Sequence, residues 1–266
     1  MGEEASWKPP RQFKSLKEFE QFLVGYLHKR NVEPIFDVTK WSYYEAGKVG
    51  SWDFDEQTLR LNAASKTNGG PPFHVEISFI RENAVVVRIN EEHPTTYGKI
   101  KAELKKGDES LVLDSRRVRV EVHLNPWNLK FLDKTGKVFL EEYAEGLKRT
   151  YFPVFPLSFK KADEDLHLVE SFGLEPNEVI YGFGERFTPL DKRGQNILSW
   201  NSDATFTGGD RAYKCVPFYT STRNYGVYVN FGGKIVFEVG SEYSSTSLSF
   251  ETWSQKLEYI VMLGSP

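Results

Sequence analysis

The sequence predicts a mainly β fold: one N-terminal amphipathic helix followed by a large, largely antiparallel β-sandwich. Apolar residues recur at helical spacing near the N-terminus, and beyond that point they alternate with polar residues along many short segments. Turn-forming residues separate these segments at roughly regular intervals, as in all-β sandwiches. We therefore divide the chain into an N-terminal extension with the helix, residues 1–35, and a β-sandwich, residues 36–266.

The predicted helix covers residues 15–30, SLKEFEQFLVGYLHKR. Its apolar side chains recur every three or four residues, which gives one apolar face. Ser15 and Glu18 have the spacing of a capping box, and the basic residues 28–30 suit the C-terminal end of the helix dipole. We expect this helix to pack on its own domain, with a partner-binding helix as the alternative.

Short strands are expected along the rest of the chain. Residues 127–143 form a predicted hairpin whose turn contains Gly136. Residues 225–240 form a second predicted hairpin, in which Gly232 and Gly233 are able to take positive φ. Further alternating or apolar segments predict strands at 73–80 and 83–90, which we expect to pair, and at 117–124, 165–172, 215–221, 247–253 and 256–263.

Composition excludes several classes of function. The 266 residues contain 34 Lys and Arg against 37 Asp and Glu, a net charge of -3, so no positive excess is present to neutralise nucleic acid. One cysteine cannot form an intrachain disulfide, and the five histidines never fall at zinc-ligand spacing, so we expect no metal and no cofactor. No apolar run could span a membrane, and the N-terminus lacks a signal-peptide core, so we expect a cytoplasmic protein.

The segment YGFGERF, residues 181–187, carries two closely spaced glycines after an apolar strand. A dinucleotide-binding loop would need a third glycine where Phe187 stands, and a helix after it. We interpret the segment instead as a tight turn. In that turn Gly182 and Gly184 allow close backbone approach, and Glu185 and Arg186 make local ion pairs.

Residues 196–219, NILSWNSDATFTGGDRAYKCVPFY, bring aromatic, charged and glycine residues together. Asp203 follows Trp200 and Asn201 in a stretch too polar for a strand interior. An aromatic face beside a carboxylate suits sugar recognition, because the ring stacks on C–H groups and the carboxylate accepts hydrogen bonds from hydroxyls. The alternative is that Asp203 caps a turn. No histidine is positioned to activate Cys215, which favours a packed thiol over a nucleophile.

Three ordered blocks between residues 179 and 230, YGFGERF, WNSD and AYKCVPFYTSTRNYGVYVN, resemble the N-terminal domain of family 31 glycoside hydrolases, the α-glucosidase and α-xylosidase family. The resemblance implies a galactose-mutarotase-like β-supersandwich. It also implies a loop that reaches over a catalytic barrel and places Asp203 against the sugar, with Trp200, Tyr213 and Lys214 as further substrate-binding residues. The blocks most resemble the α-xylosidase branch, although Cys215 stands where asparagine is common there.

The same resemblance implies that both catalytic aspartates lie in a (β/α)8 barrel that follows this domain. We find no alternation of strands and helices in these 266 residues, so we expect no catalytic residue in this chain. The expected partners are an α-linked xyloside or glucoside shared with that barrel, and further copies of the full enzyme in a homo-oligomer. Two other functions stay open: a carbohydrate-binding module, and an aldose epimerase that would need a histidine and a glutamate to converge.

Overall fold

The computed structural model describes residues 34–143, 153–201, 214–241 and 243–264, all within the compact unit Pro34–Pro266. The predicted N-terminal helix lies outside the described residues. The described residues form eighteen strands and no helix, and every pairing between these strands is antiparallel. The mainly β, antiparallel prediction is therefore confirmed.

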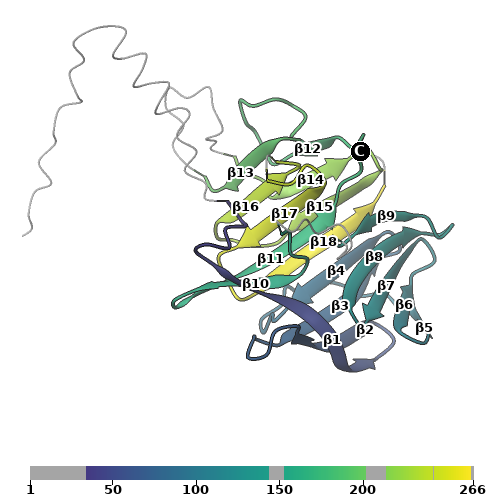
Figure 1. The fold of residues 1–266 in the computed structure, drawn as a ribbon. Helices are drawn as coiled ribbons and strands as arrows, with labels where there is room; N and C mark the ends of the chain where they lie inside the picture. The colour runs from purple at the N-terminus through teal and green to yellow at the C-terminus, as the bar shows by residue number, and fades with distance from the viewer. Residues whose placement is uncertain (1–33, 144–152, 202–213, 242, 265–266) are drawn as a thin grey trace, which may run out of the picture. The chain divides into compact units, whose positions relative to one another are not determined.

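Thirteen strands form one long sheet, which we divide at its longest strand, β1, into sheets A and B (Figure 1). Sheet A has the order β1 (Ser42–Phe54), β10 (Ser158–Ala162), β11 (Asp165–Gly173), β17 (Ser247–Thr252), β16 (Ile235–Val239), β13 (Gln195–Ser199). Sheet B continues from β1 through β2 (Thr58–Ser65), β3 (Phe73–Arg81), β4 (Ala84–Ile89), β18 (Leu257–Leu263), β15 (Tyr225–Val229), β14 (Phe218–Ser221) and β12 (Ile180–Gly182). Sheet C is separate, with the order β5 (Glu103–Lys106), β6 (Ser110–Asp114), β7 (Val118–Leu124), β8 (Trp127–Asp133), β9 (Val138–Glu141).

Strand β1 serves both sheets because its pairing changes along its length. Its first residues, Ser42 to Glu45, pair with β10, and its later residues pair with β2. The register with β2 shifts twice between Ala46 and Ser51. Such irregularities bend a strand and increase its twist, so the chain passes from one sheet into the other without ending the strand.

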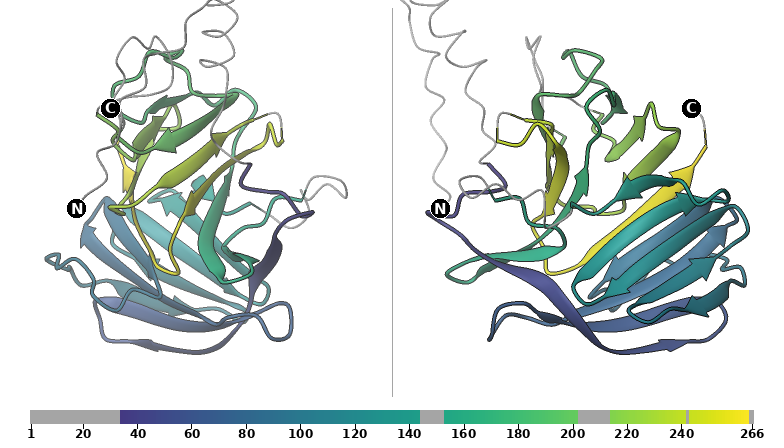
Figure 2. Two further views of the ribbon diagram at one scale, coloured as in Figure 1. Left: turned by 90° about the vertical axis from the view of Figure 1, so that its left-hand side faces the viewer. Right: turned by 45° about the vertical axis from the view of Figure 1, so that its right-hand side comes forward.

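Side chains from all three sheets share one apolar core. Tyr259 of sheet B packs edge-on against Phe172 of sheet A at 5.9 Å, and Phe172 meets Phe131 of sheet C at 6.4 Å. Phe139 of sheet C lies 6.0 Å from Tyr225 of sheet B. Figure 2 shows sheet C stacked against the long sheet. Each fully buried aromatic of this kind contributes about 1.5–3 kcal/mol, so the shared core holds the sheets as one unit.

Two buried carboxyl groups stand within this core. Glu142 accepts hydrogen bonds from the Trp127 indole N–H (3.0 Å) and the Leu129 amide (2.9 Å). Glu170 accepts hydrogen bonds from the Tyr259 hydroxyl (3.2 Å) and the Ser171 amide (2.9 Å). Burial raises the pKa of Glu142 to about 8 and raises the pKa of Glu170, which the neighbouring Glu142 raises further. The pair therefore holds a proton at neutral pH.

The two predicted hairpins have different outcomes. Strands β8 and β9 pair as expected, and Gly136 in their turn has a φ of 87°. The hairpin predicted for residues 225–240 is wrong, because β15 pairs with β14 and β18 in sheet B while β16 pairs with β13 and β17 in sheet A. Gly232 and Gly233 lie on the connection between the two sheets, and neither has a positive φ.

Candidate functional site

The tight turn predicted at residues 181–187 is confirmed. Gly182, Phe183 and Gly184 all have positive φ, at 121°, 66° and 83°. A Cβ on Gly182 would lie 2.5 Å from the carbonyl oxygen of Phe218, and one on Gly184 would lie 2.0 Å from that of Lys214. Only glycine fits at these two positions, because the segment before β14 runs directly against the turn.

Backbone hydrogen bonds extend the pairing of β12 and β14 into this turn. The Phe183 amide donates to the Phe218 carbonyl (2.8 Å), and the Glu185 amide donates to the Lys214 carbonyl (3.0 Å). The Glu185 carboxylate lies 3.2 Å from Lys214 Nζ, with both side chains exposed. An exposed pair of this kind contributes only about 0–1 kcal/mol, so the backbone and not the charges fixes Lys214 here.

Arg186 joins three segments at the base of the site. Its Nε donates to the Phe183 carbonyl (3.0 Å), and its Nη2 donates to the Leu198 carbonyl (2.8 Å) and to Cys215 Sγ (3.2 Å). The planar guanidinium can reach these acceptors at once because its donors form a rigid fork. The prediction of local ion pairs was therefore incomplete: Glu185 pairs with Lys214, and Arg186 donates to backbone carbonyls and a thiol.

The residues on either side of segment 202–213 are tied to each other. The Cys215 amide donates to Asn201 Oδ1 at 2.8 Å, across 14 positions of sequence. Of the four predicted substrate-binding residues, Trp200 and Lys214 flank this contact, and Asp203 and Tyr213 lie outside the described residues. The structure therefore brings together the two ends from which the predicted loop would extend.

Arg186 and Asn201 were not predicted to organise this base. Asn201 carried a usable signal, because asparagine side chains often accept backbone hydrogen bonds where a strand gives way to a loop. Arg186 had no such signal in the sequence, because its acceptors at Leu198 and Cys215 are 12 and 29 positions away.

A hollow of about 240 Å³ lies beside this base. Its walls come from the end of β13, the start of β14 and the β15–β16 connection, and consist of Ser199, Trp200, Asn201, Cys215, Pro217, Phe231, Gly232 and Gly233. Trp200 is 46% exposed, and the nearby segments also expose Phe187, Leu190 and Val216.

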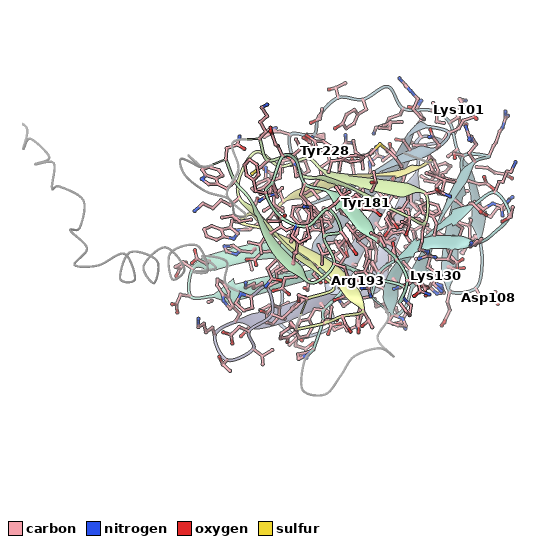
Figure 3. The ribbon with its side chains drawn as sticks, turned by 90° about the horizontal axis from the view of Figure 1, so that it is seen from above. Lys101, Asp108, Lys130, Tyr181, Arg193 and Tyr228 are labelled. Carbon is pink, nitrogen blue, oxygen red and sulfur yellow. The ribbon has the colours of Figure 1, made fainter. Side chains whose placement is uncertain are left out.

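Lys192 and Arg193 support the segment that precedes β13 in sheet A. Lys192 donates to Thr188 Oγ1 (2.9 Å) and to the Pro189 carbonyl (2.7 Å), and its pKa is lowered by burial and then by the charge of Arg186. Arg193, labelled in Figure 3, donates to the carbonyls of Glu175, Glu178 and Ser245. Both side chains therefore fix the segment that enters β13.

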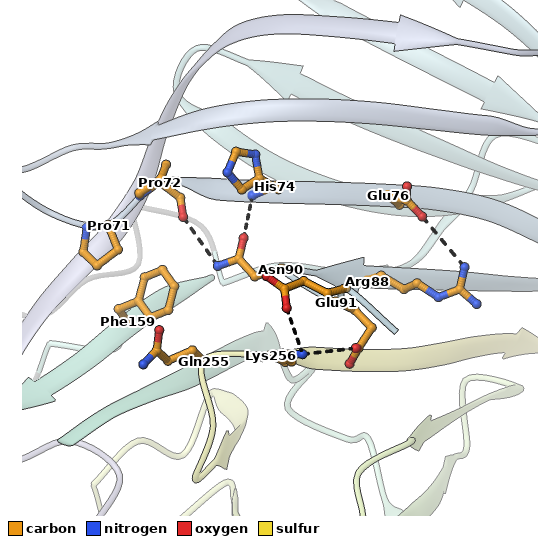
Figure 4. Close-up of a pocket in the computed structure, with 11 residues that line it drawn as sticks. Pro71, Pro72, His74, Glu76, Arg88, Asn90, Glu91, Phe159, Gln255 and Lys256 are labelled. Carbon is orange, nitrogen blue, oxygen red and sulfur yellow. Dashed lines mark hydrogen bonds and ion pairs between the residues drawn. The ribbon is translucent and has the colours of Figure 1, made fainter. Parts of the chain in front are cut away.

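A larger hollow of about 460 Å³, shown in Figure 4, lies over β3, β4 and the start of β18. It contains His74 and Glu76, the residue types that an epimerase would use. His74 Nδ1 bonds to Asn62 Oδ1 (2.6 Å), whereas Glu76 lies against Arg60 (3.2 Å) and Arg88 (3.9 Å). The two groups are engaged separately, so this hollow does not present a convergent acid and base. His167 and Glu251 do meet elsewhere, at 2.6 Å, but there Glu251 is buried and also paired with Lys160.

The described residues hold no group of three or more His, Cys, Asp or Glu side chains that could bind a metal ion. Within the same residues, no helix has the length and apolarity to cross a membrane.

Comparison with known proteins identifies the family. The glycosyl hydrolase 31 N-terminal galactose mutarotase-like domain matches residues 74–238. This chain belongs to that family. The resemblance predicted from the three sequence blocks and the mutarotase-like β-sandwich are both confirmed.

Relatives of this family 31 domain are glycoside-processing enzymes. "Alpha-xylosidase XylQ" of Lactiplantibacillus pentosus is 42% identical over 98 residues, which are 37% of this chain and 13% of the relative. An "Alpha-xylosidase" of Emericella nidulans is 43% identical over 91 residues, or 34% and 11% of the two chains. "Alpha-glucosidase 2" of Bacillus thermoamyloliquefaciens is 25% identical over 206 residues, or 71% and 24%.

Solved structures share the fold of the family 31 domain. A cycloalternan-forming enzyme from Listeria monocytogenes superposes with a TM-score of 0.71 at 20% identity, over 84% of this chain and 21% of that one. A Flavobacterium johnsoniae GH31 dextranase gives a TM-score of 0.66 at 21% identity, over 83% and 26%. The chain thus spans about a quarter or less of each of these proteins.

Proposed function

We propose that this chain is the non-catalytic N-terminal part of a retaining α-glycosidase, and that it supplies a loop to the active site of a following catalytic barrel. In this proposal Asp203, on segment 202–213, accepts hydrogen bonds from the bound sugar, and Trp200, Tyr213 and Lys214 border the site. The nucleophile and the general acid belong to the barrel, with the short carboxyl separation of retaining enzymes.

The contact that carries this proposal is the hydrogen bond from the Cys215 amide to Asn201 Oδ1. Together with the bonds that Arg186 donates to Leu198 and Cys215, it ties the residues that follow β13 of sheet A to the residues that precede β14 of sheet B. A loop that must place one carboxylate beside a sugar needs such a base, because a displacement of about 1 Å at a substrate-positioning group lowers the rate about 100-fold.

We favour an α-xyloside over an α-glucoside as the substrate. Both α-xylosidase relatives exceed 40% identity in their matched segments, whereas the α-glucosidase relative reaches 25% over a longer one. The proposed location is the cytoplasm.

A chimera tests this function. The chain would replace the N-terminal domain of the Lactiplantibacillus pentosus α-xylosidase, and hydrolysis of p-nitrophenyl α-xyloside and α-glucoside would be compared. We expect activity in the chimera, none in the 266-residue chain alone, and a fall of at least tenfold in kcat/KM on Asp203→Asn. Asp163→Asn, in the distant β10–β11 turn, is the matched control. Turnover by the chain alone, or an Asp203→Asn chimera as active as its parent, would refute the proposal.

A carbohydrate-binding module is the second candidate. It is favoured by the exposed indoles of Trp200 and Trp253, at 46% and 49% exposure. Calorimetric titration of the chain with xylose, isoprimeverose and maltose separates the two candidates, because one loop without its barrel should bind a monosaccharide very weakly.

A further inference from the structure

Five strands of sheet A, β13, β16, β17, β11 and β10, follow one another across the sheet (Figure 1). One rank of register partners crosses them: Ser199, Ile235, Thr252, Leu168 and Phe159. The side chains of Ile235, Leu168 and Phe159 point into the core. Side chains alternate along a strand, so the residues next to these in sequence, in the next rank, point to the outer face of sheet A. We name this next rank the aromatic row: Trp200, Lys234, Trp253, His167 and Lys160.

Contacts between neighbours make the aromatic row continuous. The His167 and Trp253 rings stack with centroids 5.6 Å apart and planes 10° apart. Lys234 Nζ lies 4.6 Å from the Trp253 ring centroid and 5.7 Å from that of Trp200. His167 and Lys160 are register partners on adjacent strands. The row therefore runs without a break from β10 to the base of segment 202–213.

A buried ionic group fixes one half of the row. Glu251 lies two residues before Trp253 on the same face, with its Oε1 2.6 Å from His167 Nδ1 and its Oε2 2.8 Å from Lys160 Nζ. Glu251 and Lys160 are each only 3% exposed. Lys160 Nζ also lies 4.4 Å from the Trp41 ring centroid. These contacts hold the imidazole and the indole of Trp253 in one orientation before any ligand arrives, and such preorganisation favours binding.

The two indoles of the row remain about half exposed, whereas the core indole of Trp127 is 3% exposed. We propose that the aromatic row binds a neutral oligosaccharide, laid across sheet A and leading to the hollow beside Trp200. This inference rests on the proposed function, since it takes the ligand to be an extension of the glycoside substrate.

The chemistry of the row fits sugars better than charged polymers. Indole faces stack on the C–H faces of pyranose rings, and the Lys234 ammonium can donate to hydroxyl groups. Glu251 compensates Lys160, so within the described part of the row Lys234 is the one lysine without a carboxylate partner. The accessible part of the row, Trp200, Lys234 and Trp253, lies at the ends of three adjacent strands about 4.8 Å apart and spans about 10 Å, the length of a short oligosaccharide.

Titration of the 266-residue chain tests this proposal. The probes are xyloglucan heptasaccharide and maltoheptaose, observed through the indole N–H signals of the tryptophans. We expect the Trp253 and Trp200 signals to move in a saturable way with a Kd of about 1 mM or tighter. We also expect Trp253→Ala to weaken binding about tenfold or more, which corresponds to about 1.4 kcal/mol. The matched control is Trp52→Ala, which removes a 37% exposed indole beside Lys106 on another face and should leave the affinity unchanged.

Two results would overturn the proposal: no saturable shift with either probe, or equal affinity in Trp253→Ala and the parent chain. Thermal unfolding of each variant verifies that the fold is retained. The chimera assay of Asp203→Asn is independent of this titration. If the row binds neither probe but the chimera loses activity on Asp203→Asn, only the inference made here is refuted. If the row binds a probe but the chimera keeps its activity on Asp203→Asn, only the proposed function is refuted.

Discussion

Replacing Gly184 by alanine should destabilise the base of the proposed loop more than an equivalent change elsewhere. Gly184 has a φ of 83°, and an added Cβ would lie 2.0 Å from the Lys214 carbonyl oxygen and 2.7 Å from the Val216 amide nitrogen. Both neighbours are backbone atoms, which cannot move by changing a rotamer. The segment before β14 must therefore shift, and the bond from the Glu185 amide to Lys214 would be lost with it.

The magnitude follows from two separate terms. A left-handed conformation costs an L-residue about 1–2 kcal/mol, and overpacking against a rigid neighbour costs about 1–3 kcal/mol more. Gly194 separates these terms, because it has the same φ of 83° but no atom within 4 Å of its added Cβ. We expect Gly194→Ala to lower the free energy of unfolding by about 1–2 kcal/mol and Gly184→Ala by about 2–5 kcal/mol.

Urea unfolding of both variants and the parent chain measures this difference, with tryptophan fluorescence and circular dichroism recorded together. In the proposed chimera, Gly184→Ala should also reduce kcat/KM, because the base of the loop moves. Equal losses of stability in the two variants would refute the reasoning, since they would show that the close approach of Lys214 contributes nothing.

Three further changes probe the buried charges. The native Glu142 and Glu170 pair holds a proton that the unfolded chain releases above the ordinary pKa of 4.5, so stability should fall as pH rises from 4.5 toward 8 by about 1.4 kcal/mol per pH unit for each retained proton. Glu170→Gln should flatten that fall, as urea midpoints at several pH values would show, and an unchanged slope would contradict it. Arg186→Lys cannot reach all its acceptors, so thermal unfolding should show a loss of about 1–3 kcal/mol; a loss within error of zero would count against its structural role. Lys160→Met leaves Glu251 buried with one partner fewer and should cost about 3–5 kcal/mol, much of it recovered when Glu251→Leu is added; a purely additive double variant would exclude the coupling.

Local patterns predicted the strands of this fold better than their partners. The hairpin at 127–143 could be read from the sequence because its turn and both of its strands lie within 17 consecutive residues. The segment 225–240 has the same local pattern, yet its two strands belong to different sheets. β15 pairs with β14 and β18, and β16 pairs with β13 and β17, so both edges of each strand are taken by strands from other parts of the chain. Pairing over such distances leaves no periodic signal in either strand.

In the candidate site, too, the sequence indicated individual residues but not the contacts between them. Trp200, Asp203, Tyr213 and Lys214 come from the sequence blocks that resemble the family, and the substrate-binding role of all four remains a prediction. The structure shows only that Trp200 and Lys214 flank the contact between Asn201 and Cys215. The bonds that support the site were not predictable, since Arg186 meets Leu198 and Cys215 only after β13 and β14 have been placed. Alternation along β17 could place Trp253 on the outer face, but it could not place His167 beside it.

Trp200 belongs to both proposed sites, and this allows their contributions to be separated. It lines the hollow beside Asn201 and Cys215, and it also ends the aromatic row through Lys234. A substrate that occupied both the hollow and the aromatic row would lose binding energy at both sites on Trp200→Ala. Trp253→Ala would weaken its binding to the aromatic row alone. If one oligosaccharide spans the two, Trp253→Ala should therefore raise KM for long substrates and leave that for p-nitrophenyl glycosides unchanged, because the short substrates never reach the row.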